Sequence, residues 1–458
     1  MTRQTPSAPA RTQSGPWMPP PLRSLKDTGL NIGILSDLAI KTLYFGGYLT
    51  GNEVAEQMHL PFTGVVDQVL ESIKREKFVE VRGGGGLGSG AYEYVLTMRG
   101  LEKAHEALAR TQYAGPCPVT LNQYVAAMNA QARARLTVHR DLLEKALRGL
   151  TLSEEMYGRV GPAINSGKAI SEIYTLSLHD ALPIFFMYGP PGNGKTTIAQ
   201  KIGTMILGAP MWIPYAVDVD GQIVRVFDNI NHQVLPDNDD PQQRTTATGD
   251  RRDPRWLRIR RPVIMVGGEL TLETLDLVYD PNNKYYEAPF QMKANGGMFL
   301  IDDFGRQQVR PRDLLNRWIV PLESRVDFLT LTTGRKIEIP FNVLIVFSTN
   351  MPPADLVDEA FLRRIPHKIE VGDPTEEQFR EIFQQVCEAR RMPYDDRAVT
   401  YLLQEWYTHA DRRLRAVHPR DIVDQLLDIA RYQNTPPALT KELLDRAAAA
   451  YFVDLDSY

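Results

Sequence analysis

The hydrophobic pattern between residues 35 and 109 predicts a compact helical part with one hairpin. Its order is helix, helix, turn, helix, glycine-rich hairpin and helix. Thr50 and Pro61 are suited to begin and end the second helix, and residues 79–97 alternate around glycines as two paired strands do. This order is typical of a winged helix-turn-helix, so we predict such a domain over residues 31–111. One face of its third helix collects Val65, Val66, Val69, Leu70 and Ile73.

Other segments differ in composition. Residues 1–30 are rich in Pro, Ser and Thr and lack the apolar core of a signal peptide, so a disordered leader is expected. Residues 112–170 are predicted as a linker and a helical lead-in. The chain from Asp373 onward has a helical pattern, with Asp373 as N-cap, Pro374 as first residue and Glu376 as third residue of its first helix.

One stretch is anomalous. TLSLHDALPI, at residues 175–184, resembles the translation of a widely used sequencing adapter. We interpret residues 171–184 as an insert from sequence assembly, with a native loop as the alternative, and assign no function to His179 or Asp180. Its removal would shorten the approach to the next apolar strand.

Composition is that of a soluble protein of two or three domains: 458 residues, 43% hydrophobic and 24% charged. The net charge of −4 supplies no general attraction for nucleic acid. Cys117 and Cys387 are the two cysteines, which argues against a disulfide framework and a zinc site. No apolar run reaches membrane-spanning length, so no membrane insertion and a cytoplasmic location are expected.

Charge also bears on the winged-helix-like segment. Residues 31–111 carry eight basic and ten acidic residues. A helix that reads a DNA groove needs basic or amide side chains and basic flanks for the phosphates. Protein docking or regulation is therefore favoured over DNA binding for this segment, and DNA binding stays as the alternative.

A phosphate-binding loop follows the apolar strand at residues 184–188. The segment fits G-x-x-x-x-G-K-[ST] and precedes a helical run. Such glycines let backbone N–H groups surround a β-phosphate, while Lys195 reaches the β and γ oxygens and Thr196 offers a hydroxyl to Mg²⁺. An ordinary glycine turn is the alternative. The predicted nucleotide contacts are Gly189, Pro190, Pro191, Gly192, Asn193, Gly194, Lys195, Thr196 and Thr197.

Two acids follow a second apolar strand, Met298 to Ile301. Asp302 is predicted to hold Mg²⁺, and Asp303 to orient or deprotonate the attacking water. Capping of the next helix is the alternative reading of this pair.

Three further elements with polar residues come later in the chain. Asn350 ends another apolar strand and is suited to hold the lytic water. Arg363 and Arg364 lie between a short helix and a strand. This position suits arginine fingers that reach the nucleotide of a neighbouring subunit. The alternative is that both arginines are solvated side chains at a helix end. Arg420, in the first turn of a helix, is suited to touch the γ-phosphate, or is an ordinary surface arginine.

Together these motifs resemble an AAA+ ATPase over residues 185–430, with Walker A, Walker B, sensor 1, arginine finger and sensor 2 in that order. The hairpin expected at 327–340 is similar to that of the MoxR, magnesium-chelatase and σ54-activator branch. The resemblance implies an α/β fold with a P-loop parallel sheet flanked by helices over 185–372 and a helical lid over 373–458. One departure is Asp303, where the family usually has Glu.

The same resemblance implies ATP and Mg²⁺ as cofactors and a homo-oligomeric ring, six copies in our expectation, that remodels an unidentified protein client. Val160 and Gly161 are predicted to line the adenine pocket. The alternatives are an ATP-gated, DNA-binding transcription regulator and a nucleotide-dependent scaffold that barely hydrolyses ATP.

Between Lys195 and Asp302 lie more residues than a compact P-loop core needs (302 − 195 = 107), which predicts an insertion. Residues 211–234 alternate like a hairpin, and 236–250 are polar and expected to be mobile. Residues 251–262 carry six arginines around a tryptophan. One interpretation of this run is a patch that binds nucleic acid or an acidic partner. We favour the other interpretation, a solvated face or a contact between subunits.

Overall fold

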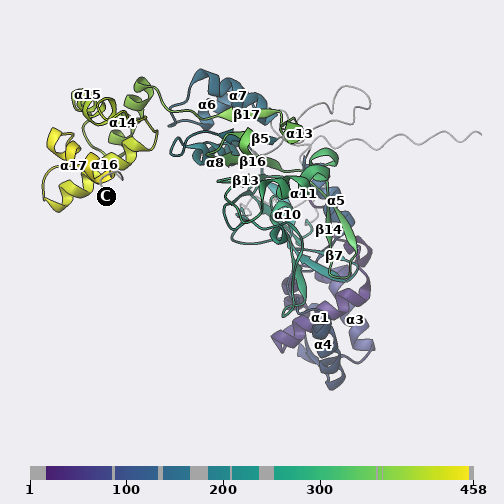
Figure 1. The fold of residues 1–458 in the computed structure, drawn as a ribbon. Helices are drawn as coiled ribbons and strands as arrows, with labels where there is room; N and C mark the ends of the chain where they lie inside the picture. The colour runs from purple at the N-terminus through teal and green to yellow at the C-terminus, as the bar shows by residue number, and fades with distance from the viewer. Residues whose placement is uncertain are drawn as a thin grey trace, which may run out of the picture. The chain divides into compact units, whose positions relative to one another are not determined.

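In the computed structural model, whose helices and strands are labelled in Figure 1, the chain forms two compact units. Unit 1 combines Met1–Arg135, Ala209–Arg260 and Tyr279–Ala288, and unit 2 combines Leu136–Gly208, Arg261–Val278 and Pro289–Tyr458. Of the predicted insert at 171–184, residues 171–183 lie outside the described residues, as do residues 1–16 of the predicted leader, residues 237–250 of the polar segment and Arg364. Leu22 and Leu30 of the predicted leader are buried in the core of unit 1. The structure describes residues 17–84, 88–132, 138–165, 184–206, 209–236, 252–356, 359–363 and 365–452.

The first part of unit 1 has the predicted order of elements. Its three-stranded antiparallel sheet has the order β1-β3-β2. Thr50 caps α2 and forms a capping box with Glu53, as its position in the sequence predicted. The five apolar side chains predicted on one helical face are all fully buried. The elements are α1 (Ile32–Gly46), β1 (Leu49–Thr50), α2 (Gly51–Met58), α3 (Asp67–Arg75), β2 (Val79–Gly84), β3 (Tyr92–Leu96) and α4 (Met98–Arg110).

The long insertion of the sequence folds into unit 1. Strands β7 and β8 form the antiparallel hairpin expected within 211–234, and they belong to a five-stranded sheet with the order β11-β12-β8-β7-β4. Strands β6 and β9 pair separately. The elements are β4 (Val119–Thr120), α5 (Leu121–Ala132), β6 (Met211–Pro214), β7 (Ala216–Val219), β8 (Gln222–Arg225), β9 (Trp256–Ile259), β11 (Val278–Asp280) and β12 (Tyr285–Glu287).

A buried arginine fastens this insertion to the N-terminal segments. Arg255 is fully buried and bonds Asp253, with 2.8 Å from Nη2 to Oδ2. Its Nη1 donates to the carbonyl oxygens of Thr28 and Pro118, each at 3.0 Å. One guanidinium therefore satisfies groups from three separate stretches of the chain, which makes it a strong determinant of unit 1.

Replacing Arg255 should destabilise unit 1 far more than replacing a surface arginine. Arg255→Met leaves the Asp253 carboxylate buried without its partner, which costs about 3–5 kcal/mol of unfolding free energy. Chemical denaturation followed by circular dichroism measures the change. The exposed Arg260→Met is the matched control, and equal stability of the two variants would contradict the role given to Arg255.

Unit 2 is built on a parallel five-stranded sheet with the order β10-β13-β16-β5-β17. Helices pack on both faces of this sheet, so the predicted α/β class with a parallel sheet flanked by helices is confirmed. The strands are β5 (Ile184–Tyr188), β10 (Val263–Val266), β13 (Met298–Ile301), β16 (Leu344–Thr349) and β17 (His367–Glu370). All five end at the same edge, which is where polar side chains gather.

Alternate residues of each strand fill two different cores. Phe185 and Met187 pack with α6 (Arg140–Ala146), α7 (Glu154–Asn165) and α8 (Lys195–Ile206). The intervening Phe186 packs on the other face with α11 (Pro311–Ser324), whose Trp318 lies 5.6 Å from the Phe299 ring. Both faces of the sheet are therefore apolar, as parallel sheets require.

The predicted hairpin before β16 is present as β14 (Val326–Thr330) and β15 (Lys336–Pro340). The C-terminal part of unit 2 is helical, as predicted, and has its own core. The N-cap expected at Asp373 was wrong, because Thr375 caps the first lid helix and shares a capping box with Gln378. The lid helices are α14 (Glu376–Ala389), α15 (Asp396–Leu402), α16 (His418–Tyr432) and α17 (Lys441–Tyr451).

Among the described residues, no helix has both the length and the apolar composition needed to cross a bilayer.

Candidate functional site

The loop between β5 and α8 depends on glycine at three positions. Gly189, Gly192 and Gly194 have φ values of +135°, +82° and +82°, in the left-handed region that disfavours other residues. A Cβ on Gly189 would lie 2.3 Å from the carbonyl oxygen of Val371. The backbone therefore adopts a tight turn directly before a helix N-terminus, the arrangement that binds phosphate.

Lys195 lies at the end of this loop and is almost fully buried. Its ammonium donates to the carbonyl oxygens of Gly189 at 2.9 Å and Pro190 at 2.8 Å, and to Oδ1 of Asn350 at 2.7 Å. Burial lowers the pKa of Lys195, and the nearby carboxylates of Asp302 and Asp303 oppose that shift. All three hydrogen-bond acceptors are neutral, so the charge of Lys195 is not cancelled by its direct partners.

Thr196 and Asp302 form the candidate metal position. The Thr196 hydroxyl donates to Oδ2 of Asp302 at 2.8 Å. A hydroxyl and a carboxylate are oxygen donors of the kind that Mg²⁺ prefers, and Mg²⁺ is commonly held by one or two carboxylates together with phosphates and water. The described residues contain no group of three or more His, Cys, Asp or Glu that could hold a metal ion. The donor set therefore fits a nucleotide-bound Mg²⁺ better than a metal held by protein alone.

Asp303 and Asn350 meet beside this position. Nδ2 of Asn350 donates to Oδ1 of Asp303 at 3.1 Å. Asp303 has a φ of +49° and is exposed, so its carboxylate is turned out of the strand direction toward the cavity that it lines. The backbone N–H of Phe304 donates to the Ser348 carbonyl at 2.7 Å and holds the ends of β13 and β16 together. Asn350 thus contacts both Lys195 and Asp303.

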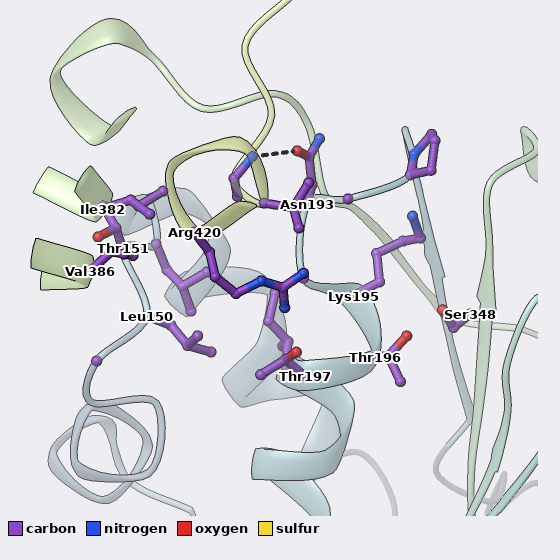
Figure 2. Close-up of a pocket in the computed structure, with 18 of the residues that line it drawn as sticks. Leu150, Thr151, Asn193, Lys195, Thr196, Thr197, Ser348, Ile382, Val386 and Arg420 are labelled. Carbon is purple, nitrogen blue, oxygen red and sulfur yellow. Dashed lines mark hydrogen bonds between the residues drawn. The ribbon is translucent and has the colours of Figure 1, made fainter. Parts of the chain in front are cut away.

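These side chains line a cavity of about 790 Å³ (Figure 2). Predicted residues from Pro191 to Thr197 line it together with Asp302, Asp303, Asn350 and Arg420. Arg420 enters from α16, its side chain 59% exposed and paired with Asp421 at 2.8 Å. The volume suits a nucleotide-sized ligand.

Sequence reasoning missed the other wall of this cavity. Gly149 to Leu152 line it from the segment before α7, and Ile382, Gln385 and Val386 line it from α14. Nε2 of Gln385 donates to the Thr151 hydroxyl at 3.3 Å, which joins these two segments. Neither segment contains a motif, so only the packing of the lid against the lead-in reveals them.

Five of the predicted residues that the structure describes do not line the cavity. Two of them, Gly189 and Pro190, accept hydrogen bonds from Lys195 through their carbonyl oxygens. Val160 and Gly161 belong to α7, where Val160 is fully buried in the core, and neither lines the cavity. Arg363 also lies outside the cavity lining, and its exposed side chain pairs with Glu359 at 2.6 Å.

The arginine-rich segment is largely committed to internal contacts. Arg252 lies over the Trp212 ring at 5.2 Å, and Arg255 is the buried clamp of unit 1. Arg261 is buried and donates to the Gly296 carbonyl at 2.6 Å. Arg260 is exposed, and Arg251 lies outside the described residues. These contacts remove much of the cationic surface that the nucleic-acid interpretation needs.

Comparison with known proteins adds a family match over the lid. Residues 375–450 match a family described as a domain of unknown function, DUF8689. No curated protein matches the sequence. Among solved structures, NtrX from Brucella abortus in complex with ADP is 13% identical, with a TM-score of 0.38, and the alignment covers 78% of this chain and 68% of that chain. A RuvB variant from Thermotoga maritima is 12% identical, with a TM-score of 0.36 and coverages of 66% and 71%.

The lid should lose stability on mild acidification through His418, which begins α16. Burial lowers the pKa of His418 to about 4, and the Arg415 guanidinium acts in the same direction. The unfolded chain takes up a proton below about 6.5, whereas the folded lid stays neutral at this ring until about pH 4. The free energy of unfolding should therefore fall as the pH is lowered through this window.

Thermal unfolding of the protein and of His418→Asn across this window measures the effect. The pH slope should be smaller in the variant, and His409→Gln, which changes an exposed ring of the lid, is the matched control. The same slope in the protein and in His418→Asn would contradict the assignment to His418.

Proposed function

We propose that this protein binds ATP with Mg²⁺ and hydrolyses it as an AAA+-type ATPase. The observation that carries the proposal is the meeting of Lys195, Thr196, Asp302, Asp303 and Asn350 in one cavity, although they come from three separate strand ends. A glycine loop with a buried lysine supplies positive potential for the β- and γ-phosphates. Two carboxylates and an amide beside it supply groups for a metal and for water.

Each residue has a defined task in this mechanism. Backbone N–H groups of the loop and the Lys195 ammonium bind the phosphates, and Thr196 and Asp302 would hold Mg²⁺. When bound, Mg²⁺ neutralises charge that develops on the phosphate oxygens. Asp303 accepts a proton from water or orients it, and the Asn350 amide fixes both the water and the Asp303 carboxylate.

Assembly into a ring and remodelling of a protein client belong to the same proposal. Arg363 or Arg364 of one subunit would stabilise charge on the phosphates of the next subunit's nucleotide, and Arg420 would couple the γ-phosphate to the lid. The internal commitment of Arg255 and Arg261 favours remodelling of a protein client over action on DNA. Gly149 to Leu152, opposite α14, would hold the base in place of Val160 and Gly161.

Two single substitutions separate binding from hydrolysis. Lys195→Ala removes the buried cation and should weaken ATP binding about 10- to 100-fold, as the loss of charge-assisted hydrogen bonds does. Asp303→Asn keeps the shape and should retain ATP binding, while kcat falls about 100-fold or more through loss of the base. A fluorescent ATP analogue measures binding, and release of phosphate measures hydrolysis.

The matched control is Asp313→Asn, which changes an aspartate on α11 that pairs with the exposed Arg310. Its binding and turnover should equal those of the native protein. An unaltered kcat in Asp303→Asn would contradict catalysis by this carboxylate and favour the scaffold alternative.

The same variant tests for a client. Asp303→Asn should accumulate with ATP bound and retain its protein partner, because release requires hydrolysis. Affinity purification in the presence of ATP, compared with Lys195→Ala, should enrich a protein only in Asp303→Asn. Enrichment of nucleic acid instead would favour the transcription-regulator alternative.

A further inference from the structure

Asn193 belongs to the loop before α8, and its side chain bonds two segments that lead into lid helices. It is 6% exposed, and both ends of its amide are used. Nδ2 donates to Oδ1 of Asp373 at 2.8 Å. Oδ1 accepts from the backbone N–H of Ala416 at 3.1 Å, the bond drawn as a dashed line in Figure 2. A carboxylate accepts only and an N–H donates only, so these partners fix which way the amide points.

Both partners lie directly before lid helices. Asp373 lies in the short connection between β17, which ends at Glu370, and α14, which begins at Glu376. Ala416 lies just before α16, the helix that carries Arg420. Asn193 therefore bonds the connection to the lid and the segment that positions Arg420 at the same time.

A third residue closes this group. Arg415 forms an ion pair with the Asp373 carboxylate, and both side chains are largely shielded from solvent. The loop and the lid segment are also in close contact, since a Cβ on Gly192 would lie 2.8 Å from Cγ1 of Val417. Asn193, Asp373, Arg415 and the Ala416 N–H, which we call the lid latch, therefore join three parts of unit 2.

We propose that Asn193 is a positioning residue that couples the nucleotide state of the phosphate loop to the lid, and so sets where Arg420 stands. This inference rests on the proposed ATPase function. Nucleotide bound by the backbone of residues 189–194 holds the loop in one shape. The lid latch transmits that shape to the connection at Asp373 and to the first turn of α16, because Asn193 is buried and the Asp373 and Arg415 side chains are largely shielded from the water that would compete for their hydrogen bonds.

A charge swap tests the lid latch. Asn193→Asp sets two carboxylates against each other and should lower kcat about 10-fold, the cost of losing one charge-assisted hydrogen bond, with ATP affinity changed about 3-fold or less. Adding Asp373→Asn to this variant places the carboxylate at position 193 and the amide at position 373. The amide can then donate to the carboxylate, which also accepts from the Ala416 N–H. The double variant should recover most of the lost kcat. Asn434→Asp, an exposed change in the lid, is the matched control.

Hydrogen exchange with and without ADP gives a readout that separates the two proposals. In the native protein ADP should protect both the phosphate loop and residues 413–422. In Asn193→Asp, ADP should protect the loop but no longer the lid segment, and the double variant should protect both again.

Protection of neither segment in the native protein would contradict the proposed function itself. Equal protection of the lid segment in the native protein and in Asn193→Asp would overturn the lid latch alone. Loss of loop protection in Asn193→Asp, or failure of the double variant to recover kcat, would show that Asn193 acts in phosphate binding or structure and would equally overturn it.

Discussion

The site depends on one constraint, which is that five strands run parallel and so end at a single edge. Hydrogen bonding of β16 to both β13 and β5 aligns their ends, with Ile301 opposite Phe347 and Thr349 opposite Tyr188. The residue after each strand end then lies within reach of the others. This is how Lys195 bonds Asn350 although 155 positions separate them in the sequence, and how Thr196 bonds Asp302. Slippage of one strand by a residue would disperse the group, because successive side chains point to opposite faces.

Electrostatics at this edge are unbalanced in a way that favours a phosphate ligand. Burial of Lys195 makes its charge costly, and the neutral oxygens around it satisfy its donors without cancelling that charge. The carboxylates of Asp302 and Asp303 lie nearby and accept hydrogen bonds from Thr196 and Asn350. A phosphate group can replace the neutral acceptors of Lys195, whereas the acids favour a cation between themselves and that phosphate. The cavity therefore combines a buried cation with carboxylates, the two kinds of charge that the proposed binding of a metal-bound triphosphate requires.

Local patterns predicted what depends on local physics. The helical face from Val65 to Ile73 and the Thr50 cap follow from spacing and short-range hydrogen bonds, and they are confirmed. The motif residues identified the cavity because a glycine loop and strand-end acids have few other uses. The N-cap at Asp373 was wrong for a tertiary reason. That carboxylate is held by Asn193 and Arg415, so Thr375 remains to accept the Gln378 N–H. Periodicity contains no information about such contacts, nor about Gly149 to Leu152, whose role arises only where the lid packs.

The long insertion illustrates the same limit on a larger scale. The spacing of the motifs predicted the length of the insertion. It did not predict where the insertion packs, because the pattern of a hairpin does not specify which distant surface the hairpin covers. Ala216 and Ile223 of the insertion share a buried core with Cys117 and with α1 and α3. Arg255 fastens the same insertion to the carbonyls of Thr28 and Pro118. Unit 1 is thus assembled from three stretches of chain, and a fragment that ended at residue 135 would expose the apolar surface that the insertion covers. The N-terminal elements and the insertion therefore share one buried core, so a change that displaces either of them exposes apolar surface of the other.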